Sequence, residues 1–321
     1  MSDNARLMRL DSQSASQLFF PMGFPVRILT NKPHVFQLAH ESWNRYCSMS
    51  IDDPLVIELQ FVDNGKVACR TPSTRIDGRC LVVAFDENNV VVADLERGVA
   101  HGTLSTSLLK HEMCLRYYVL EAVALSMISA LRAVALHGAC VAWKGRGVLL
   151  CGESGAGKTS LAYACAKNGW DYVSDDASYL LLGGEGTRVY GNCHQVRFRD
   201  ASRSLFAELE GKEVSIRVAG KPSIEVDTSE LVDVQSASCA ELRSIVFLSR
   251  RSDAVPGLRH FLYRDADAYF RRFLLLPAID GSRTDKALRR LLNVATFELT
   301  YQDLDWAVRL LSGEMEKLCY V

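Results

Sequence analysis

The sequence predicts an α/β protein, with a mixed α+β N-terminal half followed by a half built around a buried strand, a glycine-rich loop and a helix. Val148–Cys151 is a short, fully apolar run, typical of a strand buried on both faces of a sheet. Residues 152–157 are rich in glycine. Lys158–Asn168 has a helical pattern, and Gly169 stands where glycine commonly ends a helix. This order of elements predicts the fold class.

The N-terminal half carries no residue pattern that indicates chemistry. Its pattern predicts a helix over Val35–Tyr46 and a strand over Leu55–Phe61. A long, mostly apolar helix is predicted over about 108–134, and it should be packed between other elements. We place the domain boundary at its end, so the expected domains are residues 1–133 and 134–321.

The composition is that of an ordinary globular protein. Hydrophobic residues make up 48% of the 321 residues and charged residues 23%, which excludes a mainly disordered chain. The formal net charge is −1. A nearly neutral chain has no electrostatic footprint for non-specific nucleic-acid binding, so we expect no nucleic acid among its partners.

Cysteine usage and the first residues bear on location. The ten cysteines include no C-x-x-C pair, and the start of the chain has no apolar signal region. We therefore expect a cytoplasmic protein with reduced thiols. The most apolar stretch, Tyr117–Leu131, is shorter than the roughly 20 residues that span a bilayer, which predicts a buried helix and no membrane association.

The glycine-rich loop carries the clearest chemical signal. Gly152–Thr159 reads GESGAGKT and fits the phosphate-binding pattern G-x-x-x-x-G-K-[ST]. Glycines let backbone N–H groups approach phosphate oxygens, and the following helix adds N–H donors and the positive end of its dipole. Lysine supplies charge to the β- and γ-phosphates, and a threonine hydroxyl suits Mg²⁺. The predicted nucleotide-binding residues are Gly152, Glu153, Ser154, Gly155, Ala156, Gly157, Lys158, Thr159 and Ser160.

Two further features lie close to this loop in sequence. Asp175 and Asp176 follow a short predicted strand, and neighbouring strand residues point to opposite faces. One carboxylate could therefore face the transferred phosphoryl group while the other faces a metal or the loop. His137 lies on Val134–Trp143, which reads as one strand, and a histidine near an aspartate would alter the proton affinity of that carboxylate.

Other basic residues stay open as candidates. Arg197 and Arg199 either contact phosphate or an acidic acceptor, or form a solvated strand face. Residues 220–226 either form part of the nucleotide-binding cleft or lie outside it. The sequence also does not decide which arginine acts on transition-state charge among three doublets, Arg250-Arg251, Arg271-Arg272 and Arg289-Arg290.

The second half resembles the catalytic domain of bacterial HPr kinase/phosphorylase. That family carries a histidine-glycine pair, a P-loop and a double aspartate at similar spacing. The resemblance implies a fold like that of phosphoenolpyruvate carboxykinase and transfer of phosphate from ATP to a protein serine. It also implies a homo-oligomer, because HPr kinases form hexamers. The matching residues are Leu136-His137-Gly138, Gly147 to Thr159, Gly169-Trp170 and Ser174-Asp175-Asp176.

Site roles follow from the resemblance. It makes Asp175 the general base and Lys158 a catalytic residue on the nucleotide phosphates, with His137 tuning the base. Thr159 and Asp176 are the expected metal contacts, and the cofactors are ATP and Mg²⁺. Where the family carries a stretch like LEIRGLGI, this chain has the basic segment Tyr190–Arg199, which favours a related kinase with another acceptor.

The sequence thus predicts an ATP-dependent kinase that acts on a serine or another hydroxyl of an unknown protein or small molecule. One alternative is a nucleotide-binding regulatory switch without phosphotransfer to a second substrate. Another is a small-molecule enzyme like phosphoenolpyruvate carboxykinase, which would need a transition-metal site. The H-R-D, D-F-G and A-P-E signatures of ordinary protein kinases are absent.

Overall fold

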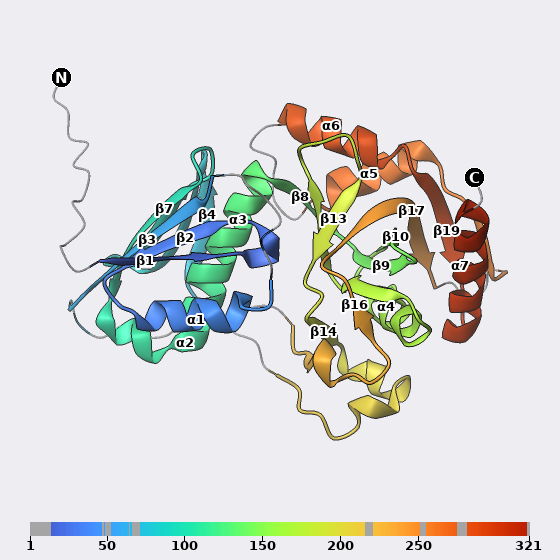
Figure 1. Cartoon of the computed structure of the whole chain (residues 1–321), viewed down its shortest axis with the longest axis horizontal. Coiled ribbons are helices and arrows are strands. Elements are labelled where there is room, and N and C mark those ends of the chain that lie inside the picture. The colour runs from blue at the N-terminus through green and yellow to red at the C-terminus, as the bar shows by residue number, and fades with distance from the viewer. Residues whose placement is uncertain are drawn as a thin grey trace. The chain divides into compact units, whose positions relative to one another are not determined.

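The computed structural model describes residues 14–46, 48, 53–63, 65, 71–215, 221–250, 255–274 and 281–319, with side chains to residue 317. The chain divides into two compact units, Met1–Ile128 and Ser129–Val321. This division falls a few residues before the expected domain boundary. Both units contain helices and sheets, so the prediction of an α/β protein is confirmed (Figure 1).

The first unit is built on one mixed sheet of seven strands. The strand order is β1-β2-β3-β7-β6-β5-β4, in which β2, β3 and β7 are parallel and the other neighbours are antiparallel. Alternate residues of β3 are buried, as expected for a sheet with one covered face. The strands are β1 (Ala15–Phe19), β2 (Val26–Thr30), β3 (Leu55–Val62), β4 (Ser73–Asp77), β5 (Cys80–Asp86), β6 (Asn89–Asp94) and β7 (Val99–Ser105).

The helices of this unit match the predicted ones in place. The predicted helix over 35–46 is α1 (His34–Trp43). The predicted long helix is a continuous helical run of α2 (Glu112–Cys114), a π-helical segment (Leu115–Glu121) and α3 (Ala122–Leu131). By length and composition this 20-residue run could cross a membrane, and just over half of its apolar window is buried inside the structure.

The cysteines differ in part from the expectation of reduced thiols. Six of the described cysteines are free, and four of these are buried. Cys114, in contrast, takes part in a disulfide bond, so the expectation was wrong for that residue.

The second unit contains a ten-stranded sheet and a separate two-stranded one. The main path runs β16-β11-β9-β10-β17-β13-β12-β8, and β19 and β18 extend it beside β17. The strands are β8 (Ala133–His137), β9 (Ala139–Trp143), β10 (Arg146–Cys151), β11 (Asp171–Ser174), β12 (Ala177–Leu181), β13 (Arg188–Gly191), β16 (Gln235–Ser236), β17 (Cys239–Ser249), β18 (Gly257–His260) and β19 (Ala295–Thr300), with β14 (Gln195–Phe198) pairing β15 (Ile224–Asp227).

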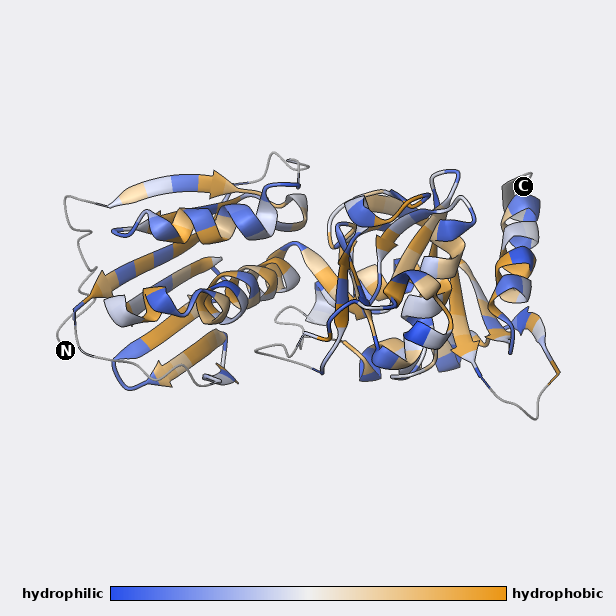
Figure 2. Ribbon diagram, turned by 90° about the horizontal axis from the view of Figure 1, so that it is seen from below, coloured by the Kyte–Doolittle hydropathy of each residue, from blue (hydrophilic) through white to orange (hydrophobic). Residues whose placement is uncertain are grey.

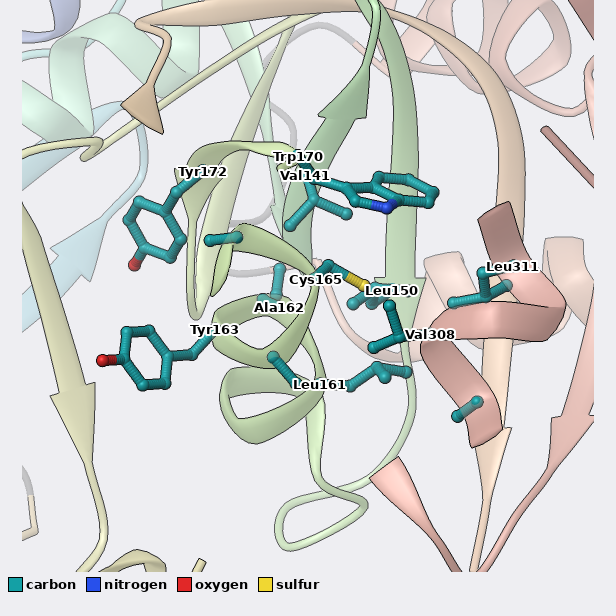
Figure 3. Packing of buried hydrophobic residues seen from close by; sticks show 14 of the residues in the cluster. Val141, Leu150, Leu161, Ala162, Tyr163, Cys165, Trp170, Tyr172, Val308 and Leu311 are labelled. Carbon is teal, nitrogen blue, oxygen red and sulfur yellow. The ribbon is translucent and has the colours of Figure 1, made fainter. Parts of the chain in front are cut away.

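Helices cover both faces of this sheet. One core packs α4 (Lys158–Lys167) and α7 (Leu304–Cys319) against the strands, and Figure 3 shows Leu150, Leu161 and Val308 within it. The other core packs α5 (Tyr263–Arg272) and α6 (Gly281–Leu291). Leu149 of β10 lies in this second core, so β10 is buried on both faces, as predicted. In Figure 2 the strands at the centre of the second unit are mostly hydrophobic, whereas the helices that cover them also carry hydrophilic residues.

The predicted single strand over 134–143 was wrong, because the chain forms two strands there. Gly138 separates β8 from β9, and its N–H donates to the Asp176 carbonyl at 3.0 Å. β8 then pairs with β12, whereas β9 pairs with β10 and β11. The break leaves His137 at the end of β8, opposite Ala177 in register and therefore next to the aspartate pair.

Candidate phosphate-binding site

The glycine-rich loop joins the end of β10 to the start of α4. Gly157 has φ +95° and immediately precedes α4, and its carbonyl accepts the Leu161 N–H at 2.9 Å. A Cβ at Gly157 would lie 2.5 Å from Tyr301 Oη, so a side chain at this position would force Tyr301 to shift. The loop therefore brings main-chain atoms, rather than side chains, to the N-terminal end of α4, as phosphate binding requires.

The role of the loop glycines can be tested by a matched pair of substitutions. Gly155 has φ +89° and open space where a methyl group would project, whereas Gly157 has both a positive φ and the Tyr301 hydroxyl. We expect Gly155→Ala to cost about 1–2 kcal/mol from backbone strain alone. Gly157→Ala should cost a further ~1–3 kcal/mol from overpacking. Thermal unfolding measures both, and equal losses would contradict the close approach of Tyr301.

Lys158 is the buried cation of the site. Its side-chain ammonium donates to the carbonyls of Gly152 at 2.7 Å and Glu153 at 3.2 Å, and it lies 3.1 Å from His137 Nε2. Burial lowers the pKa of Lys158, while the charge of Asp176 acts in the opposite direction. The loop thus holds the ammonium group through its own backbone carbonyls.

His137 links Lys158 to an acidic group. Its Nδ1 lies 3.4 Å from Asp176 Oδ1, on the opposite side of the ring from Lys158. An ammonium group can only donate and a carboxylate can only accept, so the network fits a neutral ring with the proton on Nδ1. Burial and then the Lys158 charge lower the pKa of His137, against the opposing effect of Asp176, which favours this neutral form.

The two aspartates point to different environments, although they lie in the bend between β11 and β12 rather than on a strand. The Asp176 side chain is 62% exposed and faces the same cavity as Lys158. Asp175 is only 5% exposed, and its Oδ2 accepts the Arg197 N–H at 2.8 Å. Asp175, the expected general base, therefore does not line the cavity, and Asp176 does.

Burial of Asp175 makes the stability of the fold depend on pH. Burial raises the pKa of Asp175 to about 6, with the Arg197 charge acting in the opposite direction and Asp176 adding to the rise. The unfolded carboxyl titrates near 3.9, so the folded state binds more protons between about pH 4 and 6. This group therefore contributes stability at the low-pH end of that window, and the contribution is lost as pH rises through 6.

We expect Asp175→Asn to remove this loss, because asparagine stays neutral and can still accept the Arg197 N–H. Relative to wild type, the variant should gain up to about 3 kcal/mol in free energy of unfolding between pH 4 and pH 7. Urea unfolding at both pH values measures this. Asp265→Asn, at an exposed aspartate of α5, is the control. The same pH dependence in wild type and Asp175→Asn would contradict the assignment.

Tyr269 of α5 is a site residue that sequence reasoning missed. Its hydroxyl accepts the Gly152 N–H at 2.9 Å and lies 3.0 Å from the Gly152 carbonyl and 3.2 Å from the His137 carbonyl. Tyr269 thereby joins the start of the loop to the end of β8. No local pattern in the sequence marks this role, because the tyrosine lies 117 residues from Gly152 along the chain.

A cavity of about 360 Å³ gathers most of the predicted site. Asp176 is the one acidic residue among its described lining residues. Of the predicted residues, those that line it are His137, Ser154, Gly155, Gly157, Lys158, Thr159, Ser160 and Asp176. Those that do not line it are Gly152, Glu153, Ala156 and Asp175.

The structure separates the basic candidates. Arg199 and Arg250 line the cavity. The side chain of Arg197 instead donates to Gln195 at 3.2 Å, and Arg271 pairs with two aspartates of α5 and α6. Arg290 donates to carbonyls at the end of β12 and beyond it. Arg251 and Gly220 lie outside the described residues, and the rest of the 221–226 stretch leads into β15 without lining the cavity.

Comparison with known proteins gives a structural likeness that is distant in sequence. No family model matches the chain, and no curated protein does. The solved structure of the HPr(Ser) kinase/phosphatase from Coxiella burnetii is similar over 57% of this chain and 97% of that chain, with 13% sequence identity and a TM-score of 0.34. A likeness this weak carries no functional conclusion for this chain.

Proposed function

We propose that this chain is an ATP- and Mg²⁺-dependent kinase that transfers the γ-phosphoryl group to a serine or another hydroxyl acceptor. One observation carries the proposal: the glycine-rich loop, the buried Lys158 ammonium and the Asp176 carboxylate meet in a single cavity. Phosphate binding needs the first two, and transfer to a hydroxyl needs a carboxylate beside them. The ordered motifs from Leu136 to Asp176 also support the finer proposal that the second unit is related to HPr kinase.

The chemistry divides among few residues. Backbone N–H groups at the start of α4 and the Lys158 ammonium hold the phosphates and balance their charge. The acceptor oxygen attacks the γ-phosphorus, the bond to the β,γ-bridging oxygen breaks, and ADP leaves with that electron pair. Asp176 takes the hydroxyl proton. The neutral His137 directs its Nδ1 proton toward Asp176 and so orients that carboxylate.

Mg²⁺ fits the oxygen donors that are present. The Thr159 hydroxyl and the Asp176 carboxylate line the same cavity, and hard oxygen ligands together with substrate phosphates are what Mg²⁺ prefers. Within the described part of the chain, no group of three histidine, cysteine, aspartate or glutamate residues is placed to hold a metal by itself. When bound, Mg²⁺ would be held by Thr159 and Asp176 and would neutralise charge on the phosphates.

The position of Asp176 favours a kinase over a regulatory switch. A switch and a kinase both need a carboxylate that can hold Mg²⁺, but only a kinase also needs one that can accept a hydroxyl proton. Asp176 lines the cavity together with Lys158 and Thr159, so it can serve in both roles. Its side chain is also open to solvent, which a hydroxyl acceptor must approach.

The proposal is tested by following the γ-phosphoryl group of labelled ATP. We expect the full chain to bind ATP in the presence of Mg²⁺ and to transfer the label to a hydroxyl acceptor, or slowly to water, with chelation of Mg²⁺ stopping transfer. If no nucleotide binds, the proposal fails. If ATP binds but its γ-phosphate stays in place with every hydroxyl acceptor and with water, the switch replaces the kinase.

A further inference from the structure

A second cavity adjoins the phosphate cavity. It has a volume of about 340 Å³, which is within the usual size of small-ligand sites. The two cavities share Ser204, Leu205 and Arg250 in their walls. The two cavities are therefore adjacent, and these three residues lie at their junction.

The walls of the second cavity combine an apolar surface with fixed polar groups. The apolar part comes from Leu205, Phe206, Leu304 and Ala164. Leu205 is 46% exposed. An exposed apolar side chain at the junction of two cavities offers a surface to the face of a flat ring.

The polar groups lie where α7 begins and where α4 ends. Asp303 and Asp305 line the cavity, and Asp303 Oδ1 is held in place because it accepts the Trp306 N–H at 2.7 Å. Asn168, at the end of α4, also lines the cavity, and its side-chain nitrogen donates to the Ala164 carbonyl at 2.8 Å. Carboxylates are acceptors for sugar hydroxyls, and an amide oxygen accepts from a ring amino group.

Arg250 lines both cavities. It directly follows β17, the parallel neighbour of β10, so it projects from the same end of the sheet as the phosphate-binding loop. Its guanidinium lies 5.7 Å from the centre of the Tyr301 ring, and within the described residues it forms no ion pair with a carboxylate. A guanidinium held there by an aromatic ring can contact an α-phosphate or the face of a base.

We propose that the second cavity is the nucleoside subsite, which takes the base against Leu205 and the ribose hydroxyls against the carboxylates at the start of α7. This inference rests on the proposed function, because it assumes that the phosphates lie at Lys158. It makes a nucleoside triphosphate, rather than an inorganic polyphosphate, the preferred phosphate donor. It also gives Arg250, one of the arginines that the sequence left undecided, a place between base and phosphates.

The test compares ATP with inorganic tripolyphosphate, both with Mg²⁺, by calorimetric titration of the full chain. Wild type should bind ATP at least about fivefold more tightly than tripolyphosphate, because only ATP buries apolar surface in the second cavity. Leu205→Ser should weaken ATP binding about 5- to 20-fold relative to tripolyphosphate binding, because only ATP places apolar surface against this side chain. Leu262→Ser, at a leucine that is 63% exposed and lines neither cavity, should change neither.

The outcomes separate this inference from the proposed function. Equal binding of ATP and tripolyphosphate by wild type would overturn the nucleoside subsite and leave the phosphate site standing. A preference for ATP that Leu205→Ser does not reduce would place the base elsewhere and also overturn it. If neither ligand binds, the proposed function fails, and the subsite fails with it.

Discussion

Replacing Asp176 with asparagine should lower phosphoryl transfer by about 10²- to 10⁴-fold, which is the usual contribution of a positioned acid or base. The same substitution at Asp175 should leave most of the activity. The reason is position: Asp176 lines the phosphate cavity beside Lys158, whereas Asp175 is buried and accepts a backbone N–H from β14. The two residues are adjacent and undergo the same chemical change, so each controls for the other.

The measurement is the rate of γ-phosphoryl loss from labelled ATP under saturating Mg²⁺. ATP affinity is determined in parallel, to separate binding from transfer, and thermal unfolding checks that both variants fold. If Asp175→Asn is inactive while Asp176→Asn keeps its rate, the general base is Asp175, as the family resemblance implies, and the proton-accepting role of Asp176 is wrong.

Replacing Lys158 with methionine should weaken ATP binding by roughly 10- to 100-fold, because hydrogen bonds from a charged donor are worth about 1.5–3 kcal/mol each. Methionine keeps the length and apolar stem but removes the charge. Lys317→Met, at an exposed lysine of α7 that pairs with Glu314, is the matched control and should bind ATP normally.

The same variant has a second readout that does not depend on nucleotide. The Lys158 charge lowers the pKa of His137, whereas Asp176 raises it. Relative to wild type, Lys158→Met should therefore raise the pKa of His137, and Asp176→Asn should lower it. Nuclear magnetic resonance titration of the imidazole measures both shifts. Shifts in the same direction, or none, would contradict the contact network of these three residues.

Local features of the site could be predicted from the sequence, because they lie within short segments. The glycine-rich loop is contained in eight consecutive residues, Gly152–Thr159, and the apolar strand and the helix adjoin it directly. The different environments of Asp175 and Asp176 agree with the sequence expectation, but strand geometry does not explain them, because both residues lie in the bend between β11 and β12. Which aspartate faces the cavity does not follow, because it depends on the backbone of β14, which binds Asp175 from 22 residues away.

The remaining site residues could not be predicted, because distant segments bring them in. Tyr269 reaches the loop from α5, a helix that the sequence pattern does not predict, and Tyr301 reaches Gly157 from the end of β19. In the sequence, Arg250 is one of several equivalent arginines. The parallel pairing of β17 with β10 is what places it at the cavity. Such positions depend on the topology of the sheet rather than on local pattern.

The central claim is that one cavity holds a nucleotide by its phosphates between the loop, Lys158 and Asp176. A crystal structure of the full chain with Mg²⁺ and a non-hydrolysable ATP analogue tests it most directly. We expect the γ-phosphate within hydrogen-bonding distance of the Lys158 ammonium, with Asp176 facing it and Asp175 still bonded to the Arg197 N–H. A nucleotide bound elsewhere, or Asp176 turned away from the phosphates, would contradict the account.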